Sequence, residues 1–188
     1  MFEKVLFLVV LVSVLSCNAE FSKKEKQEYT LKGKAVAEAT FKALSSELMV
    51  QMKAGGPAQA IPFCNQRAAP LTSRISTKYN VVVKRTSDKL RSCENEPTER
   101  EIDIIINYKQ LLSENKDLKP IVELDSLNGK HFYAPIIMKA NCLVCHGKLN
   151  ETMSVKTDSI IKVLYPFDIA NGYAEGDLRG IWSIAFND

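Results

Sequence analysis

The residues best suited to chemistry lie in one short segment, Cys142-Leu143-Val144-Cys145-His146. Two thiols with two residues between them can reach two vinyl groups on the same edge of one haem. The histidine that follows can bring its imidazole beneath the ring as the proximal iron ligand. This spacing therefore predicts one covalently attached c-type haem, bound through Cys142, Cys145 and His146.

Two other kinds of site use a pair of cysteines at this spacing. A structural zinc ion needs four ligands, usually supplied as two pairs, and this sequence contains a single Cys-x-x-Cys pair. A redox disulfide of the thioredoxin type opens a helix after a strand in a βαβ unit, whereas here a turn and a strand precede the pair. Haem is therefore the favoured interpretation.

The ligand on the opposite face of the iron comes from a short list, because the chain has only two histidines. His131, Met153 and Cys64 are candidates, whereas Met138 lies too close to the haem motif in the sequence. Cys64 falls on the inward face of a predicted helix. A lone inward cysteine is commonly a small buried hydrophobe, and a disulfide with Cys93 is also open.

The N-terminal segment has the features of an export signal. After Lys4, the eleven residues Val5–Leu15 are apolar except for Ser13. This run is shorter than the roughly 20 residues needed to cross a bilayer, but it fits the apolar region of a secretory signal. Export agrees with haem attachment, because bacterial c-type haem is attached on the far side of the cytoplasmic membrane.

The end of this run resembles the processing site of a bacterial lipoprotein, with Cys17 as the lipid-modified first residue of the mature chain. We therefore expect a lipoprotein signal peptide over 1–16, a tether over 17–24 and a haem domain over 25–188. The lipid would hold the protein on the periplasmic side of a bacterial membrane. Cleavage after Ala19, which would leave a soluble periplasmic protein, is the alternative.

Composition and periodicity predict one α+β domain. Hydrophobic residues make up 46% and charged residues 25% of the chain, and the net charge of +3 gives no argument for nucleic-acid binding. Helices come first and an antiparallel sheet follows. The spacing predicts helices over 22–53, 57–79, 98–112 and 157–164, and strands over 81–83, 121–124, 131–138 and 178–186, with irregular chain from 85 to 97.

Several sequence blocks outside the haem motif match one known family. The blocks are Ala60-Ile61-Pro62-Phe63-Cys64 with Ala69-Pro70, Arg85 to Arg91, Asn95-Glu96-Pro97 with Glu101, Tyr133 to Ile136, Tyr165 to Tyr173, and Gly176 to Gly180. Over residues 30–186 the chain thereby resembles the single-haem c-type proteins with a PAS-like sensor fold, the Tll-type haem-binding domain. The resemblance implies a PAS-like antiparallel sheet with long N-terminal helices.

The resemblance also implies an unusual His/Cys ligation of the iron, with His146 proximal and Cys64 distal. A thiolate ligand would favour ferric iron and lower the reduction potential. The chain departs from the family at Arg91-Ser92-Cys93, where Arg-Asn-Pro is usual, and a Cys64–Cys93 disulfide would remove the distal ligand.

Two arginines in these blocks have open roles. Arg85 or Arg91 could pair with the haem propionates, because a guanidinium matches carboxylate geometry. Alternatively, they bind the backbone and acids of their own loop, such as Asp88 or Glu94.

Three functions are compatible with this site. An exported monohaem protein suits electron transfer with a redox partner, while the PAS-like resemblance favours redox or small-ligand sensing through a separate signalling partner. A haem peroxidase is less favoured, because two strong axial ligands leave no open iron position and no acid–base pair stands near the motif.

Overall fold

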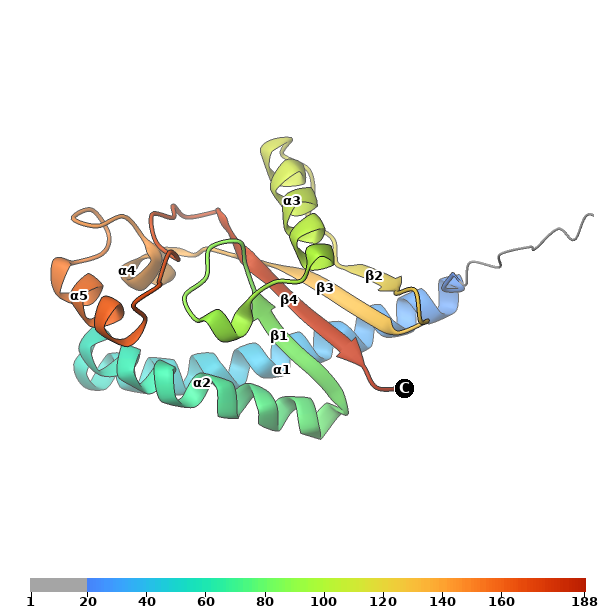
Figure 1. Ribbon diagram of the computed structural model, residues 1–188, viewed down its shortest axis with the longest axis horizontal. Helices are drawn as coiled ribbons and strands as arrows, with labels where there is room; N and C mark the ends of the chain where they lie inside the picture. The colour runs from blue at the N-terminus through green and yellow to red at the C-terminus, as the bar shows by residue number, and fades with distance from the viewer. Residues whose placement is uncertain (1–19) are drawn as a thin grey trace, which may run out of the picture.

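The structure is a computed structural model that describes residues 20–188 (Figure 1). The predicted signal peptide, and Cys17 with it, lie outside the described residues. The helices are α1 (Lys23–Gly55), α2 (Pro57–Tyr79), α3 (Glu99–Ser113), α4 (Leu143–His146) and α5 (Val155–Leu164), and two 3₁₀ turns cover Cys93–Asn95 and Ala140–Cys142. The strands are β1 (Val81–Thr86), β2 (Ile121–Leu124), β3 (Lys130–Ile137) and β4 (Leu178–Phe186).

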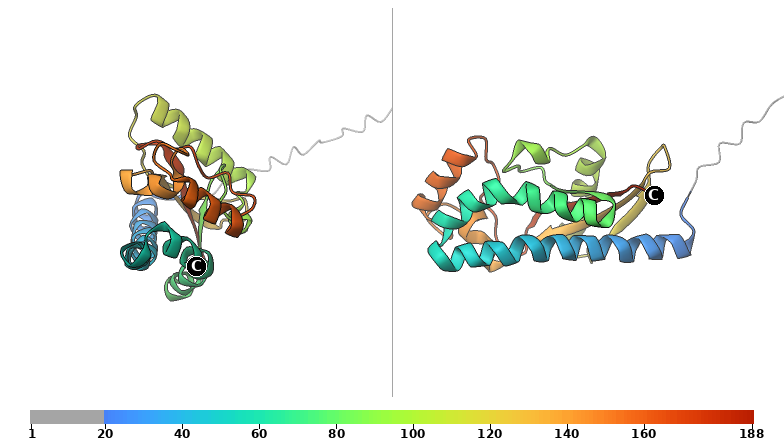
Figure 2. Two further views of the ribbon diagram at one scale, coloured as in Figure 1. Left: turned by 90° about the vertical axis from the view of Figure 1, so that its left-hand side faces the viewer. Right: turned by 90° about the horizontal axis from the view of Figure 1, so that it is seen from below.

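The four strands form one antiparallel sheet in the order β1-β4-β3-β2. Helices α1 and α2 lie side by side along one face of this sheet, and α3 lies on the other face (Figures 1 and 2). Helices precede most of the strands in the chain, so the α+β class is confirmed. Of the helices within residues 20–188, none is both long and apolar enough to cross a membrane.

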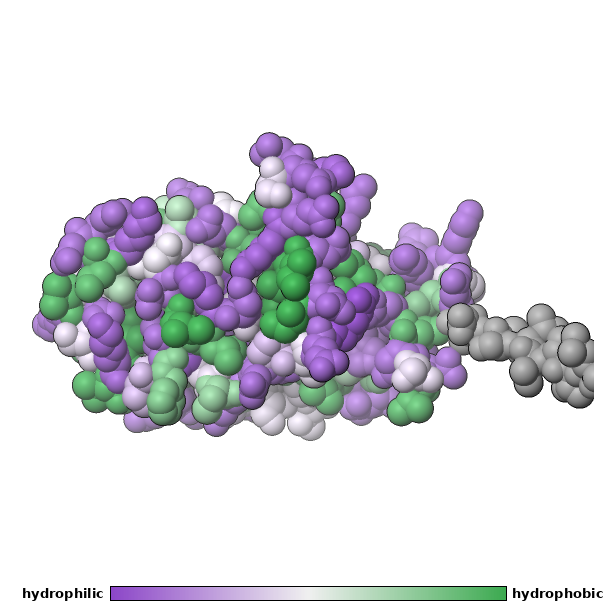
Figure 3. Space-filling model, turned by 45° about the horizontal axis from the view of Figure 1, so that its top comes forward, coloured by the Kyte–Doolittle hydropathy of each residue, from purple (hydrophilic) through white to green (hydrophobic). Residues whose placement is uncertain are grey.

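Each face of the sheet has its own hydrophobic core, as expected for a sheet covered on both sides. The core under α1 and α2 contains Val36, Phe132 and Trp182, and the core under α3 contains Ile104, Tyr108 and Ile181. The face of the molecule drawn in Figure 3, including the protruding helix α3, is largely hydrophilic with separate hydrophobic patches.

A tight turn reverses the chain between α1 and α2. Gly56 has a φ of 63°, a left-handed conformation that glycine adopts without steric cost, and Pro57 occupies the first turn of α2, where its missing N–H is not needed. Because of this turn, α2 begins at the end of the molecule where α1 ends and runs back along it. Helix α2 also packs against α5.

Three strand ends meet at this same end of the molecule. Because β4 is antiparallel to both neighbours, the end of β1, the start of β4 and the end of β3 lie together. The start of α1 lies at the opposite end (Figure 2). The fold therefore brings the segments that follow β1, precede β4 and follow β3 together at one end of the molecule.

The sequence-based prediction was wrong for the end of β1. Arg85 and Thr86 were expected in irregular chain, but they continue the strand, pairing with Trp182 and Ile181 of β4. Strand pairing overrides the polar local sequence, since the neighbouring strand satisfies the backbone. At the N-terminus, α1 begins at Lys23, two residues inside the segment expected as a tether.

Candidate functional site

The predicted haem motif lies just beyond the end of β3. A 3₁₀ turn and the single turn of α4 carry Cys142, Cys145 and His146, so the two cysteines are three residues apart on a helical turn and share a side. Both thiols are free and half-buried. The structure thus presents two thiols and one imidazole from a compact helical segment.

The orientation of His146 is fixed by the loop before β4. Its Nδ1–H donates to the carbonyl of Ala170 at 2.7 Å. This bond selects the tautomer in which Nε2 carries the lone pair and is available as a ligand. Burial, followed by nearby arginines including Arg91, lowers the pKa of His146 well below its ordinary value, which keeps the ring neutral.

The same loop braces the backbone of the motif. The amide of Gly172 donates to the carbonyl of Gly147 at 2.9 Å, and the amide of Tyr173 donates to the carbonyl of His146 at 3.1 Å. The Tyr173 ring meets the His146 ring edge-on, with centroids 6.4 Å apart. His146 is therefore held through both its side chain and its main chain.

Arg91 fastens this loop to the motif. Its Nε donates to Asp168 at 3.0 Å, and one terminal nitrogen donates to the carbonyls of Cys145 at 2.6 Å and Ala170 at 3.3 Å. The Asp168 carboxylate is only 4% exposed. These bonds use most of the guanidinium, but its partners lie in the haem motif and in the loop before β4, whereas the sequence analysis considered the backbone and acids of the arginine's own loop.

Arg85 has a different environment. It follows Val81 and Val83 on the face of β1 that looks toward α1 and α2, near Cys64. Within residues 20–188 its guanidinium has no hydrogen bond or ion pair, and burial, the largest influence, lowers its pKa. An arginine without a counter-charge in a partly buried position suits an anionic ligand.

Arg179 is a site residue that the sequence analysis missed. Ile136 pairs with Gly180 and Ile137 pairs with Leu178, so Arg179 is the extra residue of a β-bulge in β4. Its guanidinium lies 5.6 Å from the centre of the Tyr173 ring, and it is close enough to Arg85 to lower the pKa of that group. The sequence did contain one signal for Arg179, its place in the Gly176–Gly180 block. The bulge itself could not be predicted, because it is defined by strand pairing.

Cys64 lies on the half-buried face of α2, among Arg85, Arg91 and Cys145. Burial raises the pKa of its thiol, and the two arginines oppose that effect. Cys93 is exposed on the 3₁₀ turn after β1, and both thiols are free, so the structure does not contain the alternative disulfide.

The other candidate ligands have different surroundings. His131 lies at the start of β3, at the far end of the sheet from the motif, and its Nε2 bonds Asp125 at 2.9 Å. Met138 is buried with Leu143 and Tyr173, and Met153 is buried in a separate small core. Neither of the last two is exposed by more than 2%.

The zinc and redox-disulfide alternatives receive no support from the described part of the chain. Within residues 20–188 no three His, Cys, Asp or Glu side chains group closely enough to hold one metal ion. The Cys-x-x-Cys pair follows an antiparallel strand, and the sheet in that range contains no parallel βαβ unit.

Comparison with known proteins defines the relationship. A family model described as Tll0287-like matches residues 14–187. The chain belongs to the Tll0287-like family. The crystal structure of the cyanobacterial heme-protein Tll0287 superposes with a TM-score of 0.62 at 20% sequence identity, covering 88% of this chain and 96% of that one. No curated protein matched in sequence. The PAS-like fold expected from the sequence is confirmed.

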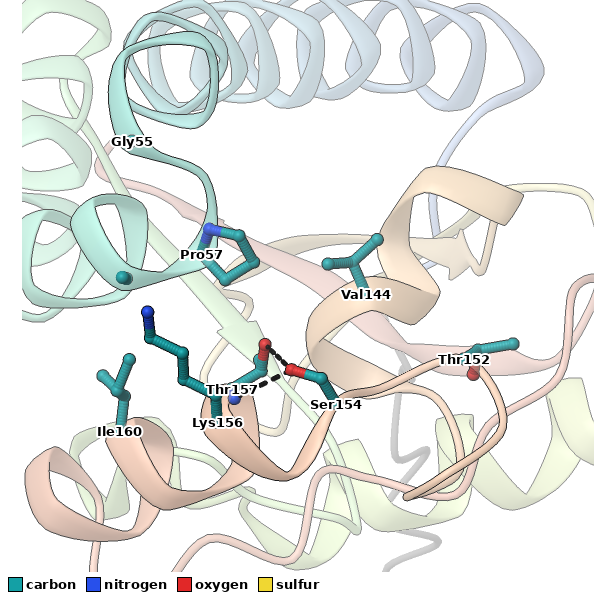
Figure 4. A pocket seen from close by; sticks show the side chains of 9 residues that line it. Gly55, Pro57, Val144, Thr152, Ser154, Lys156, Thr157 and Ile160 are labelled. Atoms are coloured by element: carbon teal, nitrogen blue, oxygen red, sulfur yellow. Dashed lines mark hydrogen bonds between the residues drawn. The ribbon is translucent and has the colours of Figure 1, made fainter.

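One hollow of this Tll0287-like chain is lined by a residue of the haem motif, and a second is lined by the loop before β4. The Val144 hollow, of about 250 Å³, lies between the α1–α2 turn and the start of α5, and Val144 of the motif faces it (Figure 4). At its rim the hydroxyls of Ser154 and Thr157 bond to each other at 2.9 Å. These two hydroxyls are therefore already partnered.

The second, which we call the Tyr173 hollow, has a volume of about 490 Å³ and lies between α3, the chain after β1 and the loop before β4. Gly147 directly follows the haem motif. A side chain there would collide with Thr152 and the carbonyl of Leu143, so this glycine lets the turn after α4 close.

Proposed function

We propose that this Tll0287-like chain carries one c-type haem on Cys142 and Cys145, with His146 as proximal ligand, and acts in electron transfer. The observation that carries the proposal is the state of His146. One ring nitrogen donates to the carbonyl of Ala170, and within residues 20–188 the other has no hydrogen-bond partner and lies in the same short segment as two free thiols. A haem iron at this site would supply reversible one-electron chemistry.

The charges around the motif fit the rest of a haem. Haem carries two propionates, and Arg85 and Arg179 are two neighbouring guanidinium groups for which residues 20–188 supply no ion pair. One terminal nitrogen of Arg179 donates to the carbonyl of Lys89 at 3.1 Å. Placing propionates against these two groups would give each cation the carboxylate that residues 20–188 do not provide.

Cys64 is the proposed distal ligand. It approaches the motif from α2, whereas His146 approaches from α4, so the two come from different elements at the same pole of the molecule. The positive charges of Arg85 and Arg91 would stabilise a thiolate there. Two strong ligands leave no open iron position, which favours electron transfer over catalysis.

The decisive variants are Cys64→Ala and its matched control Cys93→Ala. In the haem-loaded protein, Cys64→Ala should abolish the low-spin ferric paramagnetic-resonance signal of a thiolate-ligated haem, and Cys93→Ala should leave it unchanged. If the alanine variant folds poorly, Cys64→Met can replace it, because methionine keeps a buried sulfur. This variant should give a low-spin signal that differs from that of the wild type. An unchanged spectrum in Cys64→Ala would eliminate this ligand.

Sensing of a small ligand is the second candidate, favoured by the PAS-like fold of the family. The two functions predict different binding of carbon monoxide by the ferrous protein. Electron transfer predicts a haem that stays six-coordinate under carbon monoxide, whereas ready binding would favour gas sensing at the iron.

A further inference from the structure

The Tyr173 hollow combines one unneutralised cation with an apolar floor. Its walls include the aromatic ring of Tyr173 and the side chains of Leu112 and Leu178. Tyr173 is 6% exposed and Leu178 is 4% exposed, so these surfaces are parts of the packed protein. The hollow is thus a built depression that offers apolar contact to a small molecule.

Four charged side chains line the hollow, and they are not equally free. Lys109 is ion-paired with Asp88. Asp177 accepts the amide of Ala174 at 2.7 Å. Lys89 donates to the neutral carbonyl of Asn171 at 2.7 Å, and no carboxylate within residues 20–188 is paired with it.

The Lys89 ammonium is held in place by its surroundings. It lies 4.7 Å from the centre of the Tyr173 ring, in a cation–π contact, while its bond to Asn171 fixes its direction. An ammonium has three donors, so donors remain for a ligand. A carboxylate would supply the missing counter-charge, and a short apolar body attached to it would cover the floor.

The acids of the hollow limit how much negative charge a ligand brings. Asp177 has no cationic partner in the described range, so a second carboxylate or a phosphate would meet an uncompensated negative charge. One carboxylate on a compact apolar body is the best match to the walls.

The hollow is also connected to the haem motif. Tyr173 lines it, packs edge-on against His146 and donates its amide to the carbonyl of that histidine. The adjacent Gly172, also on the wall, donates to Gly147. A molecule in the hollow would therefore contact the residues that set the position of His146.

We propose that the Tyr173 hollow is a second binding site, for a small monocarboxylate, and that its occupancy changes the reduction potential of the haem through Tyr173. The coupling rests on the proposed haem function. Binding itself does not, because every contact described for it is made by protein side chains.

Direct binding is tested with benzoate, by calorimetry or by NMR titration of the full mature protein. The wild type should show saturable binding, and Lys89→Met should weaken it about tenfold or more. The matched control is the double variant Asp88→Asn/Lys109→Met, which removes a neutral ion pair and should change binding less than about threefold. Absence of saturation up to about 20 mM benzoate, or equal binding by Lys89→Met, would overturn the site.

A second variant guards against a misfolded Lys89→Met protein. Ser113→Trp places a large ring at the hollow while leaving the bonds of Lys89 intact, and it should also abolish benzoate binding. Succinate and inorganic phosphate should bind at least about tenfold more weakly than benzoate. Binding of succinate as tight as that of benzoate would contradict the single-charge argument.

The coupling is measured separately, by redox titration of the haem-loaded protein. Saturating benzoate should shift the potential in the wild type and in Asp88→Asn/Lys109→Met, but not in Lys89→Met. Binding of benzoate with no shift in the reduction potential would overturn the proposed coupling but not the binding site. A protein that binds benzoate but takes up no haem would instead count against the proposed function.

Discussion

At the scale of single residues, the partners of each arginine around the haem motif decide what it can do. Arg91 is bonded to Asp168 and to two backbone carbonyls, so it fastens one loop to the motif. Arg85 has no such partner among the described residues, so its charge remains for a ligand. The two arginines are therefore distinguishable by experiment although they lie six positions apart in one sequence block.

We expect Arg91→Met to destabilise the haem-free protein much more than Arg85→Met does. Arg91→Met leaves the buried Asp168 carboxylate unpaired and should lower the free energy of unfolding by about 3 kcal/mol or more. Arg85→Met removes a charge that has no partner and should change it by less than about 1 kcal/mol. Urea unfolding of both variants measures the difference.

In the haem-loaded protein, the variant that matters is Arg85→Met, and the quantity that it changes is the reduction potential. Arg85→Met should lower the reduction potential, because an unneutralised propionate stabilises ferric iron. Equal destabilisation of the haem-free protein by both variants, with no shift in potential for Arg85→Met, would contradict the assignment of roles.

These roles could not be separated from the sequence. Arg91 meets Asp168 across 77 positions, and that contact exists only once the loop before β4 returns to the motif. The Cys-x-x-Cys-His spacing was a local signal and needed no fold. Arg179 was missed because a β-bulge is a property of strand register.

At the scale of elements, local capping signals gave accurate boundaries. The prediction of α2 over 57–79 matches the structure at both ends, where Pro57 begins the helix and Asn80 ends it in a left-handed conformation. Thr98 and Glu101 form the predicted capping box of α3. The end of β1 was missed because its pairing partners in β4 lie about a hundred residues away.

Glu101 should make stability depend on pH. Burial raises its pKa, but bonds from Lys84 at 2.6 Å and from the Thr98 amide outweigh burial and hold the pKa below its ordinary value of 4.5. A lowered pKa in the folded state contributes stability that is present above 4.5 and is lost as the pH falls through the folded value.

Glu101→Gln should therefore cost about 1–3 kcal/mol at pH 7, and the difference from the wild type should shrink as the pH falls below 4.5. Urea unfolding at a series of pH values tests this. The exposed neighbour Glu99, substituted as Glu99→Gln, is the control and should have a smaller effect. A cost for Glu101→Gln that grows toward low pH would show that the sign is wrong.

Gly33 explains how closely α1 approaches the sheet. A side chain at this position would collide with the ring of Phe132 on β3, which is fully buried. Alanine at an exposed helical glycine stabilises by about 1 kcal/mol, but Gly33→Ala should destabilise by about 1–3 kcal/mol because the helix must move off the sheet.

Thermal unfolding shows whether Gly33→Ala stabilises or destabilises the protein. Lys34→Ala, on the exposed side of the same helix, should change stability by less than about 0.5 kcal/mol. A Gly33→Ala protein as stable as the wild type would mean that α1 does not lie this close to β3.

At the scale of the whole molecule, the fold separates its two ends. Helix α1 has 33 residues and is therefore about 50 Å long, and the haem motif lies near its C-terminal end while the chain enters at the other. Every segment proposed to touch the haem, from α2, β1, α4 and β4, ends or begins at that pole. The antiparallel order of the sheet is what brings them together.

The central claim, a single covalent haem on Cys142 and Cys145, is tested most directly by a pyridine-haemochrome assay. The mature chain, produced together with haem-maturation machinery, is denatured and freed of any dissociable haem before measurement. We predict one haem per chain that remains attached after denaturation and is lost in the Cys142→Ala/Cys145→Ala variant. A chain that retains no haem after denaturation, or the same haem content in the double variant, would contradict the account.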